Sequence, residues 1–213
     1  MIGRTLIALL LVAPAASQPG GQGRSATTGP SSRRDGAGNH QGRILKFKHM
    51  RVDLDRREIV LDAEVCLREG TLELLICKAG SKEHESILHT DAAAAHLHAA
   101  LLALGLTPGK PAEWSAGDQP RPIPPRGAAL KLTLRWKDKK GKLRQADPST
   151  WLAPADTAVK AAFPKTWVFV GSDTLSDGRY WADVDGDVVS VANFESAVID
   201  VPFESSNKNA ILS

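Results

Sequence analysis

The sequence predicts an α+β fold in which an antiparallel-rich sheet of several hairpins packs against one main helix. Three observations predict it. Short apolar or alternating segments recur between turn residues, as expected for strands. One alanine- and leucine-rich segment, residues 91–104, carries leucines at helical spacing. Strand segments outnumber helical ones and no strand–helix–strand rhythm repeats, which argues against a parallel α/β fold.

The N-terminus has the pattern of a signal peptide. A short basic start precedes a compact apolar run from Thr5 to Val12, and Ala13-Pro14-Ala15 supplies the small residues that a signal peptidase reads. We therefore expect residues 1–17 to be a leader, cleaved near residues 15–17, and the protein to be periplasmic or extracellular. No apolar run in the sequence reaches the roughly 18 residues of a membrane helix, so we expect no membrane span in the mature chain.

Residues 18–42 follow with seven glycines and with only Ala26 and Ala37 as aliphatic side chains. Such a segment buries too little apolar area to offset the entropy of ordering it, so we expect a disordered tether. Residues 43–213 then form a single domain. Of the net charge of +3, residues 1–43 hold five arginines against one acid, which leaves 22 basic and 23 acidic residues in residues 44–213. A near-neutral domain argues against nucleic-acid binding.

The first half of the domain predicts strands. Residues 44–54 form a strand region that turns at residues 55–57, and residues 59–67 and 71–77 are expected to pair as a hairpin through a Glu69-Gly70 turn. That register gathers the leucines on one face. It also places Cys77 opposite Asp62, about 13 Å from Cys66 at roughly 3.3 Å per residue. A disulfide needs Cα atoms within about 7 Å, so the sequence predicts two free cysteines.

The helix at residues 91–104 is expected to begin after Thr90 as its N-cap and to end at Gly105. A proline-rich surface loop covers residues 107–127; its 120–125 segment is read as plain loop rather than a polyproline ligand. Strands are expected at 130–136, from residue 142 after a turn at 138–141, and at 167–170, with a short helix at 156–163. Residues 180–184 and 187–191 are expected to form a hairpin turning at Asp185-Gly186, a better fit than a calcium loop.

The run Lys82-Glu83-His84-Glu85-Ser86 is the most concentrated group of chemically capable residues. An imidazole between two carboxylates suits general acid–base catalysis, so Glu83, His84 and Glu85 are the candidate catalytic residues. His84, His89 and Cys77 are weak candidates for a metal site. The spacing of these histidines matches no helical zinc motif, and no nucleotide-binding loop or serine nucleophile elbow occurs, so we expect no cofactor. We favour a structural role for His84 in the turn towards the helix.

Several of these segments resemble the YdjY-like domain of exported bacterial proteins. The resemblance covers about residues 44–213 and rests on the motifs around both cysteines, on the helix with its Pro-Gly-Lys-Pro end, and on three later segments. The full set of segments that carry the resemblance is Val65-Cys66-Leu67-Arg68-Glu69-Gly70, Cys77 with residues 82–86, residues 104–111, Trp167 to Ser172, Asn193-Phe194 and Ser205-Ser206-Asn207. The resemblance implies export and implies no particular reaction.

The sequence therefore predicts a non-enzymatic binding module of the cell envelope, held by its flexible N-terminal segment. Its partner would be an envelope protein or a wall component. The alternative is a metal-dependent or acid–base hydrolase centred on Glu83, His84 and Glu85.

Overall fold

The computed structural model describes residues 6–12, 42–154, 163, 165–205 and 210–212. Most of the predicted tether and most of the predicted helix at 156–163 lie outside these residues. The strands are β1 (Leu6–Val12), β2 (Ile44–Phe47), β3 (Met50–Asp53), β4 (Glu58–Val65), β5 (Leu74–Lys78), β6 (Ser86–Thr90), β7 (Glu113–Trp114), β8 (Pro122–Ile123), β9 (Ala128–Lys137), β10 (Leu143–Ala146), β11 (Leu152–Pro154), β12 (Thr166–Phe169), β13 (Asp187–Ser190), β14 (Ile199–Asp200) and β15 (Ala210–Leu212). The helices are α1 (Ala94–Ala103) and α2 (Trp181–Asp185), with 3-10 turns η1 (Glu83–Glu85) and η2 (Pro148–Trp151).

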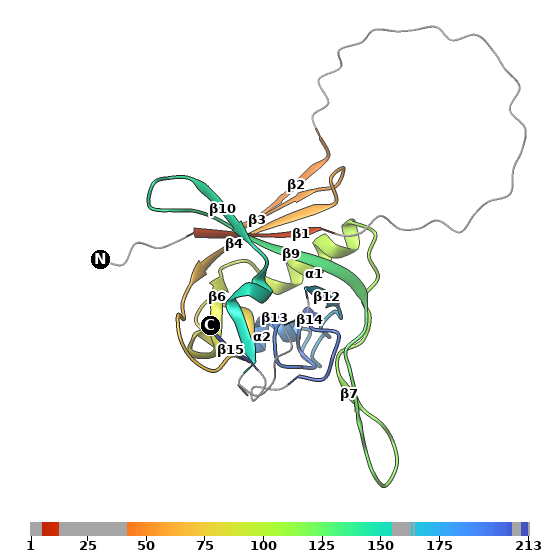
Figure 1. The fold of residues 1–213 in the computed structure, drawn as a ribbon. Helices are drawn as coiled ribbons and strands as arrows, with labels where there is room; N and C mark the ends of the chain where they lie inside the picture. Colours follow the sequence, from red (N-terminus) through yellow and green to blue (C-terminus); the bar gives the residue numbers. More distant parts are fainter. Residues whose placement is uncertain (1–5, 13–41, 155–162, 164, 206–209, 213) are drawn as a thin grey trace, which may run out of the picture.

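One large curled sheet dominates the described residues (Figure 1). Its strand order is β1-β9-β12-β14-β13-β5-β6-β4-β3-β2, with β10 beside β9. Because β1 also pairs with β4, the two ends of the path from β9 to β4 meet at β1 and the sheet closes into a ring. The pairs β5–β6 and β13–β14 are parallel. The fold is thus a β-rich mixed sheet with one main helix, and the expected antiparallel sheet of hairpins is wrong in that respect.

Several predicted elements are confirmed. The region 44–54 is a strand pair, β2 and β3, and the chain turns at residues 54–57 into β4. β9 contains the predicted strand at 130–136, turns at 138–141 and pairs with β10. β12 lies between β9 and β14, inside the sheet, as its continuous apolar sequence predicts.

The hairpin predicted from residues 59–67 and 71–77 is wrong. β6 lies between β4 and β5, antiparallel to β4 and parallel to β5. The reason is burial, since all four residues from Leu74 to Cys77 are buried. A strand that is buried on both faces has no solvent face, so collecting leucines on one face does not determine its register.

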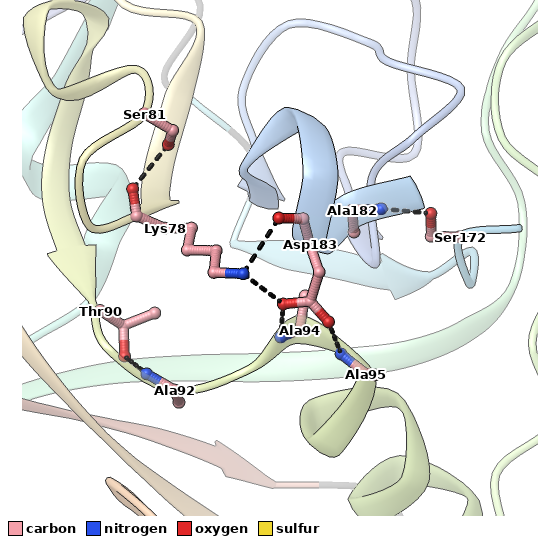
Figure 2. A network of polar contacts seen from close by, with 9 residues as sticks. All are labelled: Lys78, Ser81, Thr90, Ala92, Ala94, Ala95, Ser172, Ala182 and Asp183. Carbon is pink, nitrogen blue, oxygen red and sulfur yellow. Dashed lines mark hydrogen bonds and ion pairs between the residues drawn. The ribbon is translucent and has the colours of Figure 1, made fainter. Parts of the chain in front are cut away.

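The helix α1 begins at Ala94, and Thr90 is not its N-cap. The Thr90 hydroxyl instead donates to the Asp62 carbonyl and accepts from the Ala92 amide. Two backbone N–H groups of the first turn are satisfied by Asp183, whose carboxylate accepts from the Ala94 and Ala95 N–H groups at 2.8 and 3.1 Å (Figure 2). Gly105, with a φ of +78°, follows the helix end as predicted.

Asp183 lies in α2, where the sequence predicted one strand of a hairpin. Residues 181–185 form a short helix that Gly186 ends with a φ of +89°, a conformation that glycine adopts without strain. The predicted strand at 187–191 is β13, but it pairs with β5 and β14 instead of with residues 180–184. The three aspartates face separate partners: Asp183 caps α1, the Asp185 carboxylate accepts from the Trp181 indole, and Asp187 binds Lys82.

The helix α1 joins the core through Ala94, Leu97, Ala100 and Leu101, which are buried with side chains of the sheet. At its exposed margin the His96 ring contacts Phe47 of β2, and the His98 ring meets Phe169 of β12 edge-on. The helix therefore covers the sheet between these two strands. Within the described residues, no helix has the length and apolar sequence to cross a membrane.

Candidate functional site

The candidate catalytic run lies in the connection between β5 and β6, where Glu83 to Glu85 form the single turn η1. The Glu83 carboxylate accepts from the Gly80 amide at 2.9 Å and lies 2.8 Å from Nδ1 of His89. The hydrogen bond from Gly80, followed by that from His89, lowers the pKa of Glu83. Glu83 therefore remains ionised and orients His89, two residues that the sequence did not pair.

His84 is not the structural histidine that we expected. Its side chain is 78% exposed, and its Nε2 lies 3.9 Å from a Glu85 oxygen. The 3-10 turn directs the ring outward, so the imidazole covers no buried backbone group. Glu85 meets Glu73 instead, and burial, then the charge of Glu73, raises the pKa of Glu85. The three candidate catalytic side chains thus have different partners and do not converge.

A row of polar side chains crosses four strands beside this turn. Glu64 of β4 pairs with His89 of β6, His89 pairs with Cys77 of β5, and Cys77 pairs with Asp187 of β13. Directly paired residues place their side chains on the same face of a sheet. His89 therefore lies between two carboxylates, with Nε2 3.9 Å from Glu64 and Nδ1 on Glu83. Only the strand order β4-β6-β5-β13 produces this row.

The two cysteines meet at the start of β6. Cys66 follows β4 directly, and its amide donates to the Ile87 carbonyl, while its Sγ lies 3.1 Å from the Ser86 carbonyl oxygen. Cys77 is fully buried in β5, and the neighbouring Cys66 thiol is the largest cause that lowers its pKa, to about 7. Both thiols are free, as predicted, but the predicted separation of about 13 Å is wrong because it assumed the hairpin.

A second polar group escaped the sequence analysis. Lys82 donates to the buried Asp187 carboxylate at 2.8 Å and its Nζ lies 4.4 Å from the ring centre of Phe194. The other Asp187 oxygen accepts from the Ser196 hydroxyl at 2.5 Å. The contact between Lys82 and Phe194 joins two segments on which the family resemblance rests, residues 82–86 and 193–194. No local pattern could have indicated it, because 105 residues separate Lys82 from Asp187.

A shallow cavity of about 340 Å³ lies over β2, β3 and β4, and none of the candidate site residues lines it. Among the residues that the structure describes, no group of three or more His, Cys, Asp or Glu side chains has the arrangement of a metal site. His84, His89 and Cys77 therefore do not come together as a ligand set.

Among the side chains that the structure describes, the most exposed large apolar one lies elsewhere, on an arm formed by β7 and β8. These strands form their own two-stranded sheet, which reaches away from the body of the domain (Figure 1). Trp114 on this arm is 69% exposed. The base of the arm is fixed by backbone hydrogen bonds in both directions between Lys110 and Arg126, and both cations contact Glu113. From the sequence we predicted a surface loop here; the signal for an arm was an isolated tryptophan among prolines and glycines.

Comparison with known proteins identifies a family. The model of the YdjY domain matches residues 50–210, well over half of the chain. The match covers the connection between β5 and β6, both cysteines, the arm, and Asp187 with its partners. No curated protein and no solved structure matches the chain. The extent of the family match shows that the chain belongs to the YdjY domain family.

Proposed function

We propose that the protein is an exported, non-enzymatic domain of the cell envelope that binds an envelope protein or a wall component through the β7–β8 arm. The observation that carries this proposal is Trp114, presented to solvent on an arm whose base is fixed by hydrogen bonds and ion pairs. Tryptophan and arginine are enriched among residues that dominate binding energies at interfaces. A structured arm also loses little conformational entropy when it binds.

The electrostatics of the arm agree with this role. Glu113 lies between Lys110 and Arg126, at 3.3 and 3.2 Å, so the base of the arm has paired charges beside the exposed Trp114. Farther out, the Arg121 amide donates to the Ser115 hydroxyl and the Ser115 amide to the Arg121 carbonyl, which holds the two sides of the arm together. An aromatic anchor with a polar rim is the usual anatomy of a recognition surface.

Export is supported by the leader pattern of residues 1–17, and residues 18–42 supply the proposed tether. The hydrolase alternative gains no comparable support. Glu83 is engaged by Gly80 and His89, His84 points to solvent, and Glu85 pairs with Glu73. A general acid–base mechanism needs its groups within reach of one substrate.

The test compares two exposed apolar side chains on different hairpins. The full chain, its Trp114→Ala variant and its Leu143→Ala variant are each expressed in the producing cells. The cells are then cross-linked, and the envelope proteins and wall fragments bound to each chain are quantified. Leu143, 64% exposed on β10, is the matched control. Removing an anchor tryptophan costs about 2 kcal/mol or more, so we expect at least a tenfold loss for Trp114→Ala and none for Leu143→Ala. Equal recovery from all three chains, or turnover of a substrate by the purified domain, would overturn the proposal.

A further inference from the structure

The slot between β4 and β9 is the strongest unassigned feature of the described residues. β1 fills it, antiparallel to both strands, and pairs with β4 at seven positions and with β9 at six (Figure 1). The same residues form the apolar run of the leader that we expect to be removed on export. A binding site in this slot therefore rests on the proposed export, because cleavage of the leader is what empties the slot.

The slot keeps the width of one strand when β1 is lost. Neighbouring strands lie about 4.8 Å apart, so β4 and β9 are about 10 Å apart and cannot hydrogen-bond to each other. On their other sides β4 is held by β3 and β6, and β9 by β10 and β12. Closing the gap would produce a ring with one strand fewer, which requires a different strand tilt and stagger throughout the ring. The two edges therefore stay apart and keep unpaired backbone groups.

The inner face of the slot is apolar. Directly paired residues place their side chains on the same face of a sheet. Three alternate positions of a strand in the slot each lie between a residue of β4 and a residue of β9 that are buried or half-buried in the core. These pairs are Ile59 with Leu132, Leu61 with Leu134, and Ala63 with Trp136. An entering strand must therefore supply apolar side chains at alternate positions.

The outer face of the slot has balanced charges. One outward position lies between Glu58 and Lys131, and another lies between Asp62 and Arg135. A charged side chain at either position would meet both signs, so a neutral side chain fits better. In addition, Nε of Arg135 is buried and has no hydrogen-bond partner among the described residues. A hydroxyl or amide oxygen on the entering strand would supply the missing acceptor.

We propose that the mature protein binds, between β4 and β9, an extended segment of an envelope protein that alternates apolar with neutral polar residues. The segment takes the place of β1 as a strand antiparallel to both edges. Backbone hydrogen bonds to the two edges provide affinity, and the alternating apolar positions provide specificity. In the unprocessed chain β1 blocks the same slot, so removal of the leader and binding of the partner are linked.

Two other occupants fit the slot less well. The chain's own tether, residues 18–42, has seven glycines and only Ala26 and Ala37 as aliphatic side chains, so it cannot supply three alternate apolar residues. A second copy of the chain has no spare strand among those that the structure describes, because each of them is already paired within its own sheet. The occupant is therefore a segment of a different protein.

The test uses the exported protein, purified from the envelope fraction and checked by intact mass for the loss of its leader. The probe is a synthetic peptide that alternates threonine and valine over the seven positions of the slot, with lysines at both ends for solubility. We expect one peptide to bind per chain. Hydrogen exchange at the amides of residues 58–64 and 131–136 should then slow at least tenfold, while exchange in α1 stays unchanged.

Two matched controls test the mode of binding. A peptide with proline in place of its central valine lacks an N–H group and fits poorly in a ladder, so it should bind at least tenfold more weakly. The unprocessed full chain, in which β1 occupies the slot, should also bind the valine peptide at least tenfold more weakly. Equal binding in either control would overturn the proposal.

Three further results would contradict the proposed site. The cleaved protein could bind no peptide, could protect residues 58–64 and 131–136 without any peptide, or could form a dimer that the peptide does not dissociate. Each of these results contradicts the slot alone, because capture through Trp114 is measured separately. A chain that retains residues 1–17 in the envelope contradicts the proposed export and the slot together.

Discussion

Asp200 is a buried carboxyl group that the sequence analysis did not single out. It lies in β14 with no exposed surface, and its Oδ1 accepts from the Asn193 amide group and from the Val201 N–H. Its Oδ2 has no hydrogen-bond partner among the described residues. Burial raises the pKa of Asp200 to about 7, although the two hydrogen bonds to Oδ1 lower the pKa and offset part of this effect.

This pKa makes the stability of the protein depend on pH in a defined direction. Between about pH 4, where an unfolded aspartate ionises, and pH 7, the folded protein retains a proton that the unfolded chain loses. The contribution of Asp200 to the free energy of unfolding therefore decreases as the pH rises through this window. We expect Asp200→Asn, which keeps the acceptor oxygen, to gain a few kcal/mol relative to wild type between pH 4.5 and 7.5.

Urea unfolding of both proteins at the two pH values measures this difference. Asp118→Asn, a change of the same type in an exposed loop, controls for net charge and should parallel the wild type. If Asp200→Asn and wild type keep a constant difference in stability across the window, Asp200 does not titrate as described.

Single residues were the least predictable part of this molecule. The segment 82–86 was correctly singled out as a concentration of polar chemistry, but the role of each member depends on its direction. His84 and Glu83 are adjacent in sequence, yet one side chain is exposed and the other binds His89. A strand alternates its side chains and a 3-10 turn does not, so the turn at Glu83–Glu85 decides where each of these side chains points.

At the scale of elements, the start of α1 depends on a residue that is distant in sequence. Asp183 accepts from two amides of the first turn and also from Lys78 Nζ at 3.2 Å (Figure 2). Losing a helix N-cap costs about 0.5–2 kcal/mol. We expect Asp183→Ala to lose about 1–3 kcal/mol, because buried amides are then left without a partner, and Asp183→Asn to lose less.

Lys78→Met separates the capping role from the ion pair. Lys78 is partly exposed, and such pairs contribute about 0–1 kcal/mol, so this variant should cost less than Asp183→Ala. Urea unfolding of the three variants, with circular dichroism of the folded states, is the measurement. A Lys78→Met variant as unstable as Asp183→Ala would show that the ion pair, and not the cap, holds the helix.

The same contact shows how far local sequence patterns extend. The leucine spacing correctly predicted the helix, and Gly105 its end, because both signals lie within the element. The cap lies 89 residues away in α2, and so it could not be predicted from residues near Thr90. The two wrong hairpins have the same origin: β6 separates β4 from β5, and the segment before β13 is a helix. Neighbours in sequence were assumed to be neighbours in the sheet.

At the scale of the whole molecule, the N-terminal segment connects the fold to the proposed export. Residues 6–12 pair with β4 over seven positions and with β9 over six. The same residues are the apolar run of the predicted leader. Cleavage near residues 15–17 would remove β1. The edges of β4 and β9 that pair with β1 would then have lost this partner strand. An unpaired edge is a template for another strand, so the mature domain would have to close or cover this position.

The most direct test asks whether the protein acts outside the cytoplasm as a binding domain without its leader. The measurement is the intact mass of the protein recovered from an envelope fraction of the producing cells. We expect a chain that has lost its first 15–17 residues and retains residues 43–213. Recovery of the chain only from the cell interior, with residues 1–17 still attached and β1 therefore retained, would contradict export and with it the proposed role in the envelope.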